Sequence, residues 1–534
     1  MRRFFALATL SFLLSPLAAS AAEYRTLDGT GNNASHPTWG TAMTHLKRTE
    51  SAAYADGFAS PAGASRPGVR VLSNALSTYD GTLTEDRGLT DMVWVWGQFL
   101  AHDTDLTETH VPAEPMTIAV PLGDTTFDST SLGTKTIGFS RSLYDTSTGT
   151  GPGNPRQQIN QVTSFIDGSQ IYGVDPARAL AIRTLVGGQL KTSPGNLMPF
   201  NTLGFHNEII GTNPAFFLAG DIRTNEHVAL SSLHILFLRE HNRIAAEIAQ
   251  KEQNLSDEEL YQRARQIVQA ELQTITMNEF LPAFLGRSLA PYRSYDAGID
   301  PSTSNMFATS AFRFHTMVGN QLLRLNDNGT PHAAGHLTLR QASQAPQQLV
   351  SHGIDPLLKG LMTQKQQAGY LQAVDGLRNI LFGPPGSPGT DIIARDIQRG
   401  RDHGLPHYNA VRVAYGLPAV TSFSQITKNT SVATKLQQLY PSINDIDPFV
   451  GMYAEDHVMG GAVGPLTRAI LTEQFTRTRA GDRFWYERTL KGTDLMKMRT
   501  LKLSDVIKRN TTLKNVQSNV FRVPVTSKIP SFPF

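Results

Sequence analysis

Apolar residues recur along much of the chain at helical intervals. The stretch from Asp91 to Asp103 is apolar almost all round, which predicts a buried helix capped by Asp91. Residues 226–251 predict a long helix, and residues 304–325 predict another. Ser256 and Glu259 have the spacing of a capping box, and apolar residues follow them at helical intervals. We therefore predict a mainly α-helical fold with little β structure.

The N-terminal part of the chain differs from this helical pattern. Residues 1–21 begin with Arg2 and Arg3, continue with an apolar run and end in small residues, as a signal peptide does. The apolar run is shorter than the roughly 20 residues that a membrane span needs. Residues 22–77 are rich in Gly, Ser, Thr, Asn and Pro and predict an irregular arm. Later Gly/Pro-rich breaks are too short for linkers, so we expect one domain over 22–534, exported to a periplasm or secreted.

Charge and cysteine content narrow the functional classes. The formal net charge of +3 falls to +1 when Arg2 and Arg3 are removed, so binding of nucleic acid or of an anionic membrane is not indicated. The chain has no cysteine, which excludes disulfides, cysteine nucleophiles and thiolate-bound metals. Nothing in the composition indicates an oligomeric state.

Three polar residues interrupt the apolar segment 91–103. Gln98 and His102 are four residues apart and share a helix face, whereas Asp103 is rotated by about 100° from His102. Burying unpaired polar groups costs a few kcal/mol, so each needs a partner or a function. The pair is explained either as a core histidine held by a glutamine or as part of a site.

Residues 163–169, TSFIDGS, place side-chain oxygens at Thr163, Asp167 and Ser169, with the backbone carbonyl of Phe165 between them. Such a loop can wrap a hard cation, and calcium needs six to eight oxygen ligands. Asp103 could supply a further carboxylate. The alternative is an ordinary turn rich in Ser, Thr and Asp.

Two later segments combine charged residues with apolar surroundings. Arg223 and Glu226 lie at the start of the helix expected over 226–251, and solvated ion pairs would explain them as well as a site would. His315 lies in an apolar stretch, and Asp396 follows in a second polar segment. A carboxylate that accepts the second N–H of a histidine orients a metal-ligating imidazole, although a satisfied core histidine looks the same in sequence.

Taken together, these segments resemble the animal haem peroxidases of the peroxidase–cyclooxygenase superfamily. The motifs, in the same order, are WGQFLAHD, TSFIDGSQIYG, AGDIRTNE, LREHNRIA, AFRFH and IQRGRDHGLPHYNA. RTLDGTGNNASHPTWG near the N-terminus and VGPLTRAILTEQFTRTRAGDRFWYE near the C-terminus extend the resemblance across nearly all of the mature chain. One motif alone is weak, but the joint order and span are highly specific.

The resemblance implies a helical fold around haem b. It implies His102, Arg223 and Gln98 as catalytic residues on the distal side, and His315 as the proximal iron ligand. It also implies Glu226, Asp396 and Arg399 beside the cofactor, and a calcium ion bound by Asp103, Thr163, the Phe165 carbonyl, Asp167 and Ser169. The activity implied is reduction of hydrogen peroxide and oxidation of phenolics, halides or thiocyanate through a ferryl state of the iron.

The chain departs from the mammalian members of this family at several positions. Ala101 replaces an aspartate that forms an ester with the haem, so Glu226 is the one remaining candidate for a covalent link. His227 replaces a methionine that forms a sulfur link. The spacing between Arg313 and the proximal histidine is one residue shorter, and Asp396 replaces an asparagine.

Two other functions remain as alternatives. A haem fatty-acid dioxygenase of the same superfamily needs a radical-forming tyrosine, and here that position is Phe312. A non-enzymatic adhesion or matrix protein could also reuse the fold. The chain has no Arg-Gly-Asp tripeptide, and the presence of His102, Arg223 and His315 favours catalysis.

Overall fold

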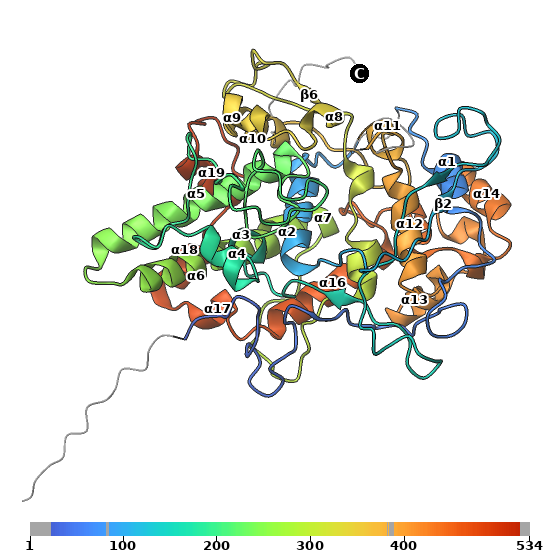
Figure 1. Ribbon diagram of the computed structural model, residues 1–534, viewed down its shortest axis with the longest axis horizontal. Helices are drawn as coiled ribbons and strands as arrows, with labels where there is room; N and C mark the ends of the chain where they lie inside the picture. The colour runs from blue at the N-terminus through green and yellow to red at the C-terminus, as the bar shows by residue number, and fades with distance from the viewer. Residues whose placement is uncertain (1–22, 82–84, 382, 384–388, 524–534) are drawn as a thin grey trace, which may run out of the picture.

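The computed structural model describes residues 23–81, 85–381, 383 and 389–523, which form a mainly helical body (Figure 1). The expected signal peptide, residues 1–21, lies outside the described residues. The α-helices are α1 (Val69–Leu76), α2 (Met92–Thr104), α3 (Ser169–Tyr172), α4 (Pro176–Ala181), α5 (Val228–Lys251), α6 (Asp257–Ile275), α7 (Leu281–Leu285), α8 (Leu339–Ala342), α9 (Gln347–His352), α10 (Asp355–Leu361), α11 (Asp375–Arg378), α12 (Ile392–Asp402), α13 (Tyr408–Ala414), α14 (Thr430–Leu439), α15 (Pro448–Ala454), α16 (Pro465–Ala480), α17 (Tyr486–Thr489), α18 (Gly492–Thr500) and α19 (Leu503–Asn510).

The small amount of β structure expected from the sequence is confirmed. Within the described residues, six two-residue strands pair antiparallel as β1 (Thr44–His45) with β4 (Ile159–Asn160), β2 (Ile118–Ala119) with β3 (Thr136–Ile137), and β5 (Gln321–Leu322) with β6 (Leu337–Thr338). The other short elements are the π-helices η1 (Thr276–Phe280) and η2 (Phe307–Ala311) and the 3-10 helices η3 (His315–Met317), η4 (Phe423–Gln425) and η5 (Ile443–Asp445). The hydrophobic core is therefore formed mainly by helices.

Helix α2 runs through the middle of the molecule, between the long helices α5 and α6 on one side and α12 on the other (Figure 1). Its burial on nearly every side agrees with its apolar sequence, and Trp96 is fully buried against the rings of Phe99 and Phe237. The prediction that Asp91 caps this helix is wrong. Asp91 has helical backbone angles, and its carboxylate makes no capping hydrogen bond, because a side chain reaches the first N–H groups from an extended N-cap.

The paired helices α5 and α6 match the sequence expectation. Helix α6 begins with the capping box: Glu259 N–H donates to Ser256 Oγ over 3.2 Å, and Ser256 N–H donates to Glu259 Oε2 over 2.8 Å. Helix α5 begins at Val228, two residues later than expected, because His227 is its N-cap. The Leu230 N–H donates to His227 Nδ1 over 3.1 Å.

The prediction of a single helix over residues 304–325 is wrong. The π-helix η2 ends at Ala311, the 3-10 helix η3 starts at His315, and β5 begins at Gln321. The Arg313 side chain donates through Nε to the carbonyl of Ala308 over 2.7 Å, which satisfies a backbone group at the end of η2. The apolar spacing reflects burial of the whole segment and therefore cannot distinguish a continuous helix from a broken one.

Helix α1 lies inside the range 22–77 that was expected to be irregular. It packs beside α12 and α14 (Figure 1), burying Val69, Leu72 and Leu76 at helical spacing. Before α1, the described part of this range carries only the short strand β1 as regular structure. Within the described residues, none of the helices is both long and apolar enough to span a membrane.

Candidate functional site

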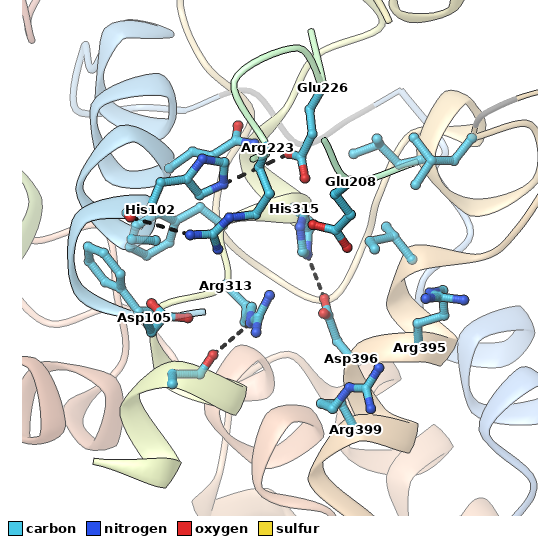
Figure 2. Close-up of a pocket in the computed structure, with 18 of the residues that line it drawn as sticks. His102, Asp105, Glu208, Arg223, Glu226, Arg313, His315, Arg395, Asp396 and Arg399 are labelled. Atoms are coloured by element: carbon cyan, nitrogen blue, oxygen red, sulfur yellow. Dashed lines mark hydrogen bonds and ion pairs between the residues drawn. The ribbon is translucent and has the colours of Figure 1, made fainter. Parts of the chain in front are cut away.

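A cavity of about 340 Å³ lies between α2, the segment before α5, η3 and α12. Its lining includes six of the polar residues that the sequence singled out, namely Gln98, His102, Arg223, Glu226, His315 and Asp396, together with Arg399. Figure 2 shows the side chains of His102, Arg223 and His315 pointing into the same space. The cavity thus joins residues from four separate regions of the sequence.

His102 is buried at the cavity wall between two carboxylates. Its Nδ1 lies 3.8 Å from Asp221 Oδ1, and its Nε2 lies 3.9 Å from Glu226 Oε2. Burial, together with the positive charge of Arg223, lowers the pKa of His102 well below its ordinary value. The imidazole is therefore neutral near pH 7 and has a nitrogen able to take up a proton.

Arg223 lies beside His102 in a buried ion pair. It donates through Nε to Asp221 Oδ1 over 2.9 Å and through Nη2 to Asp221 Oδ2 over 2.7 Å. It also donates from Nη2 to the backbone carbonyl of His102 over 3.3 Å. Burial opposes ionisation of Asp221, but the adjacent guanidinium outweighs burial and holds the pKa of Asp221 below its usual range. The charge of Arg223 is thus balanced by Asp221.

Gln98 is held in one orientation by a chain of hydrogen bonds. His227 Nδ1 accepts from the Leu230 N–H, and burial lowers the pKa of His227 to about 4, so the proton of this neutral ring lies on Nε2. His227 Nε2 then donates to Gln98 Oε1 over 2.7 Å. The Gln98 amide nitrogen donates to Glu226 Oε2 over 2.6 Å. One further amide N–H of Gln98 remains for another acceptor.

Glu226 lies in the cavity wall near a second carboxylate, Glu208. Burial and then the charge of Glu208 raise the pKa of Glu226 to about 8. Burial also raises the pKa of Glu208. Figure 2 shows both side chains directed into the cavity from the segment that precedes α5. At neutral pH, Glu226 is therefore predominantly a neutral carboxylic acid.

On the other side of the cavity, His315 contacts a buried carboxylate. His315 Nδ1 lies 2.6 Å from Asp396 Oδ2, and Asp396 is 4% exposed (Figure 2). Since a carboxylate only accepts, Nδ1 carries the hydrogen and Nε2 is the nitrogen left to bind a metal.

The arginines near Asp396 have other partners. Arg401 donates to Asp447, Arg395 donates to the Gly138 carbonyl, and Arg399 donates to the Ser142 hydroxyl and to Asp402. None of these hydrogen bonds involves Asp396, whose carboxylate bonds to His315 instead. Arg395, Arg399 and Arg313 also line the cavity.

The segment 163–169 folds around Asp103, one residue beyond His102. The Asp103 carboxylate accepts from the backbone N–H groups of Asp167, Gly168 and Ser169 over 3.1, 3.1 and 2.6 Å. The Ser169 hydroxyl also donates to Asp103 Oδ1 over 2.9 Å. The structure therefore brings Asp103 and this distant loop together.

The charges of Asp103 and Asp167 lack full compensation. Asp167 Oδ1 accepts from the Thr163 hydroxyl over 3.0 Å, but Asp167 Oδ2 is buried without a hydrogen-bond partner. Burial, and then the negative charge of Asp167, raise the pKa of Asp103 well above its ordinary value. Phe165 lies in the same buried loop. A divalent cation would compensate both carboxylates.

A cation at this loop would need hydroxyl and carbonyl ligands as well. Across the described residues, no group of three or more His, Cys, Asp or Glu side chains is arranged to hold a metal. Calcium accepts neutral oxygen ligands alongside carboxylates, and the hydroxyls of Thr163 and Ser169 and the carbonyl of Phe165 are of this kind.

Sequence reasoning missed two carboxylates that line the cavity, Asp105 and Glu208, and a third, Asp221, that pairs with Arg223 beside it. Asp221 is two residues before Arg223 in a segment that was already singled out, so the local Asp-x-Arg pattern could have suggested the ion pair. Glu208 lies in an irregular segment with no periodicity or motif around it. Its position in the cavity depends on tertiary structure alone.

Comparison with known proteins shows the family. The model of the family described as "Animal haem peroxidase" matches residues 24–521. Peroxinectin A from Dictyostelium discoideum is 35% identical over 483 residues, covering 88% of this chain and 90% of that protein. A human peroxidasin homolog is 36% identical over 560 residues and covers 94% of this chain, but the match spans only 37% of that longer protein.

Solved structures show the same relationship. Peroxidase A from Dictyostelium discoideum superposes with a TM-score of 0.88 at 34% identity, covering 94% of this chain and 100% of that chain. A fatty acid alpha-dioxygenase from Oryza sativa gives a TM-score of 0.79 at 21% identity, covering 94% of this chain and 87% of that chain, which shows a shared fold alone. The chain therefore belongs to the animal haem peroxidase family, and its activity class is that of a haem-dependent peroxidase.

Proposed function

We propose that this protein uses hydrogen peroxide to oxidise small donors, such as phenolics, halides or thiocyanate, at a haem b bound between His102 and His315. The observation that carries the proposal is that both histidines line one cavity, with His315 bonded through Nδ1 to the buried Asp396. This arrangement leaves Nε2 of His315 as the metal ligand. When bound, the haem supplies an iron centre that accepts the two oxidising equivalents of peroxide.

In this proposal His102 moves the proton of the bound peroxide. A neutral imidazole takes the proton from one peroxide oxygen and delivers it to the other, which becomes water. His102 suits this role because burial keeps it neutral and it lines the cavity with its Nε2 3.9 Å from Glu226 Oε2. General acid–base catalysis of this kind typically contributes about 10²–10⁴-fold.

Arg223 and Gln98 orient the groups around His102. Asp221 fixes the guanidinium, which in turn bonds to the backbone of His102. Because Asp221 balances its charge, Arg223 acts through directed N–H groups more than through net charge. Gln98, fixed by His227 and Glu226, has an N–H free to hold water or a halide.

We propose Glu226 as the residue that can form one ester with the haem. Its carboxyl lines the cavity, and its raised pKa keeps it in the neutral acid form that an ester replaces. Ala101 has no carboxyl at the other family position, so no ester can form there. Arg399 and Asp396 would lie against the cofactor from α12.

We also propose a calcium ion bound by Asp103, Thr163, the Phe165 carbonyl, Asp167 and Ser169. Support comes from the two buried carboxylates and from Asp167 Oδ2, which accepts no hydrogen bond and has Arg25 Nε 3.9 Å away. Because Asp103 follows His102 directly on α2, the ion would fix the position of the proton-transferring imidazole. We further propose that residues 1–21 are a signal peptide and 22–534 the haem domain of an exported protein, secreted or periplasmic.

The rival function, oxygenation of fatty acids, lacks its tyrosine in this cavity. Phe312 lines the cavity at the relevant position and has no hydroxyl to form a phenoxyl radical. The shared fold with a plant dioxygenase does not distinguish the two chemistries. The adhesion alternative would have no need of a neutral histidine facing this cavity.

The test begins with the absorption spectrum of the full chain expressed with haem available. A Soret band that is lost in His315→Ala and kept in His102→Ala would support the two assignments. A matched surface variant, His45→Ala, should keep the band, because His45 is a half-exposed residue of β1. Absence of any band would contradict haem binding. Oxygen uptake with a polyunsaturated fatty acid, without peroxide-driven oxidation of a guaiacol-type phenol, would favour the dioxygenase.

A further inference from the structure

A buried tyrosine and histidine form a pair outside the cavity. Tyr172, the last residue of α3, donates its hydroxyl hydrogen toward His241 Nδ1 on α5 across 3.0 Å. Both residues are fully buried. In Figure 1, α3 lies against α5 and α6, on the side of α2 that faces away from α12.

The direction of this hydrogen bond follows from the other nitrogen of the ring. His241 Nε2 lies 2.8 Å from the backbone carbonyl of Gly188, and a carbonyl only accepts. Nε2 therefore carries the hydrogen, and Nδ1 offers its lone pair to the Tyr172 hydroxyl. Burial lowers the pKa of His241 to about 4, which agrees with a neutral ring. The phenol thus has a base in direct contact with its proton.

Helix α3 connects this pair to the cavity. It starts at Ser169, whose hydroxyl donates to Asp103, the neighbour of His102. Gln170 also donates to the backbone carbonyl of Phe99 on α2 over 3.2 Å. Tyr172 is therefore linked to α2, the helix that carries His102, through one turn of helix and the hydrogen bonds of Ser169 and Gln170.

Tyr261 continues the pair toward the surface. Its ring centroid lies 5.9 Å from that of Tyr172 and 5.4 Å from that of His241. The Arg183 guanidinium covers the ring of Tyr261 at 3.8 Å and bonds to Glu258, whose side chain is 58% exposed. Arg183 therefore connects the buried ring of Tyr261 to an exposed carboxylate at the surface.

We propose that Tyr172 is a redox-active residue that gives an electron to the peroxide-oxidised haem while its proton passes to His241. The proposal rests on the haem peroxidase function above. One of the two oxidising equivalents of peroxide removes one electron from Tyr172, the O–H bond breaks, and the proton binds Nδ1 of His241. The products are a neutral phenoxyl radical and an imidazolium. A donor electron and return of the same proton restore the pair.

The surroundings disfavour a tyrosine radical that keeps its proton. Arg265 lies over the Tyr172 ring at 5.6 Å, so a positively charged phenol radical that kept its proton would be repelled. Among the groups that face the pair, Arg183 and Arg265 are cationic, and Glu240 and Glu271 are acidic. Passing the proton to His241 keeps the radical uncharged, at the cost of forming an imidazolium that burial, Arg183 and Arg265 disfavour. Tyr261 then offers a route for electrons from donors too large to enter the cavity.

Another buried tyrosine provides a matched control. Tyr440 donates to Asp447 Oδ2 over 2.8 Å, but Arg401 and Arg66 also bond to that carboxylate. Burial opposes ionisation of Asp447, and the two arginines outweigh it and lower the pKa of its carboxyl. Both oxygens of Asp447 already accept from arginines, so a proton from Tyr440 would have to displace an ion pair, whereas Nδ1 of His241 meets the Tyr172 hydroxyl with no arginine bonded to it. Tyr440 should therefore not be oxidised in this way.

The experiment is rapid-freeze electron paramagnetic resonance of the haem-loaded full chain after one equivalent of peroxide, with no donor added. We expect a tyrosyl signal in the wild type, a loss of at least tenfold in Tyr172→Phe, and no loss in Tyr440→Phe. Tyr261→Phe should keep the signal and lengthen its lifetime. A wild-type signal in Tyr172→Phe would overturn the proposal.

Two measurements keep the outcomes separate. Equal Soret intensity in each variant shows that haem is still bound, and absence of haem from the wild type would contradict the proposed function itself. Wild-type protein containing ring-deuterated tyrosine should give a narrowed radical spectrum, which does not depend on any variant folding. If haem is bound and reacts with peroxide but no tyrosyl signal forms, the redox role of Tyr172 is wrong while the peroxidase function stands.

Discussion

The contact between His315 and Asp396 predicts a measurable effect on the haem iron. A charged carboxylate 2.6 Å from Nδ1 draws the ring hydrogen toward itself and makes the imidazole a stronger electron donor to a metal at Nε2. Asp396→Asn removes the charge and hardly changes the volume. We expect the ferric/ferrous midpoint potential to rise in the variant, because ferric iron loses more stabilisation than ferrous iron.

The size of the shift follows from the geometry. The carboxylate would lie roughly 7 Å from an iron bound across the ring, and Coulomb's law at an effective dielectric constant of about 20 gives about 2 kcal/mol per unit charge. Since about 1.4 kcal/mol corresponds to a tenfold change, or about 59 mV for one electron, the midpoint should rise by roughly 100 mV. Asp396 also interacts with Arg395, which will offset part of this charge effect. The expected rise in midpoint potential is therefore between some tens of millivolts and roughly 100 mV.

The assay is a spectroelectrochemical titration of the Soret band for both proteins. Asp375→Asn is a suitable control, because it removes a carboxylate whose side chain is 71% exposed on α11, where solvent screens the charge. The control should leave the midpoint nearly unchanged. If Asp396→Asn keeps its haem and also leaves the midpoint unchanged, the carboxylate does not tune His315 and has only a structural role.

Four further changes test other parts of the structure. His102→Ala should slow reaction with peroxide about 10²–10⁴-fold in stopped-flow absorbance while haem stays bound, and a near-normal rate would remove its proton-transfer role. Asp103→Ala should lose calcium by elemental analysis, and unchanged content would remove Asp103 from the ligands. Glu226→Gln should release all its haem on acid–organic extraction; if the wild type releases it too, no ester forms. Burial raises the pKa of Glu50 to about 7, so the wild type should lose stability as pH rises from the unfolded-state value of 4.5 through 7. Glu50→Gln should abolish that loss, so that in urea unfolding at pH 8 the variant is more stable than the wild type by up to about 3 kcal/mol. If the stabilities of wild type and variant depend on pH in the same way, Glu50 is ionised in the folded protein.

The sequence predicted the long helices well because their signals are local. Apolar spacing and the Ser256–Glu259 box are enough to identify α6, and the burial of α2 follows from its composition. The break after Ala311 was missed because it depends on a side chain, Arg313, that satisfies a backbone carbonyl five residues earlier. The prediction that Asp91 caps α2 was wrong for a similar reason. Whether its carboxylate can cap the helix depends on the backbone angles at residue 91, which the residue type does not determine.

In the candidate site, too, the features with local sequence signals were predicted and those that depend on tertiary structure were missed. The motifs identified His102, Arg223 and His315, and the structure brings all three to one cavity. Glu208 was missed because no motif contains it, although its charge helps set the protonation state of Glu226. Sequence patterns name residues in short segments, whereas the electrostatics of a cavity depends on every segment that reaches it.

Helix α2 shows why fold and site are constrained together in this protein. Gln98 is partly buried, and His102 and Asp103 are buried, in an otherwise apolar helix, and their partners lie 64 to 129 residues further along the chain. A helix with these three groups unpaired would cost several kcal/mol to bury, so α2 reaches its final environment only when the loop 163–169 and the segment 221–227 dock against it. Those two segments also position the proposed calcium ligands and Arg223. Loss of the cation should therefore loosen α2 from the side of Asp103 and displace His102, so that calcium removal lowers the rate of peroxide reaction before it releases haem held by His315.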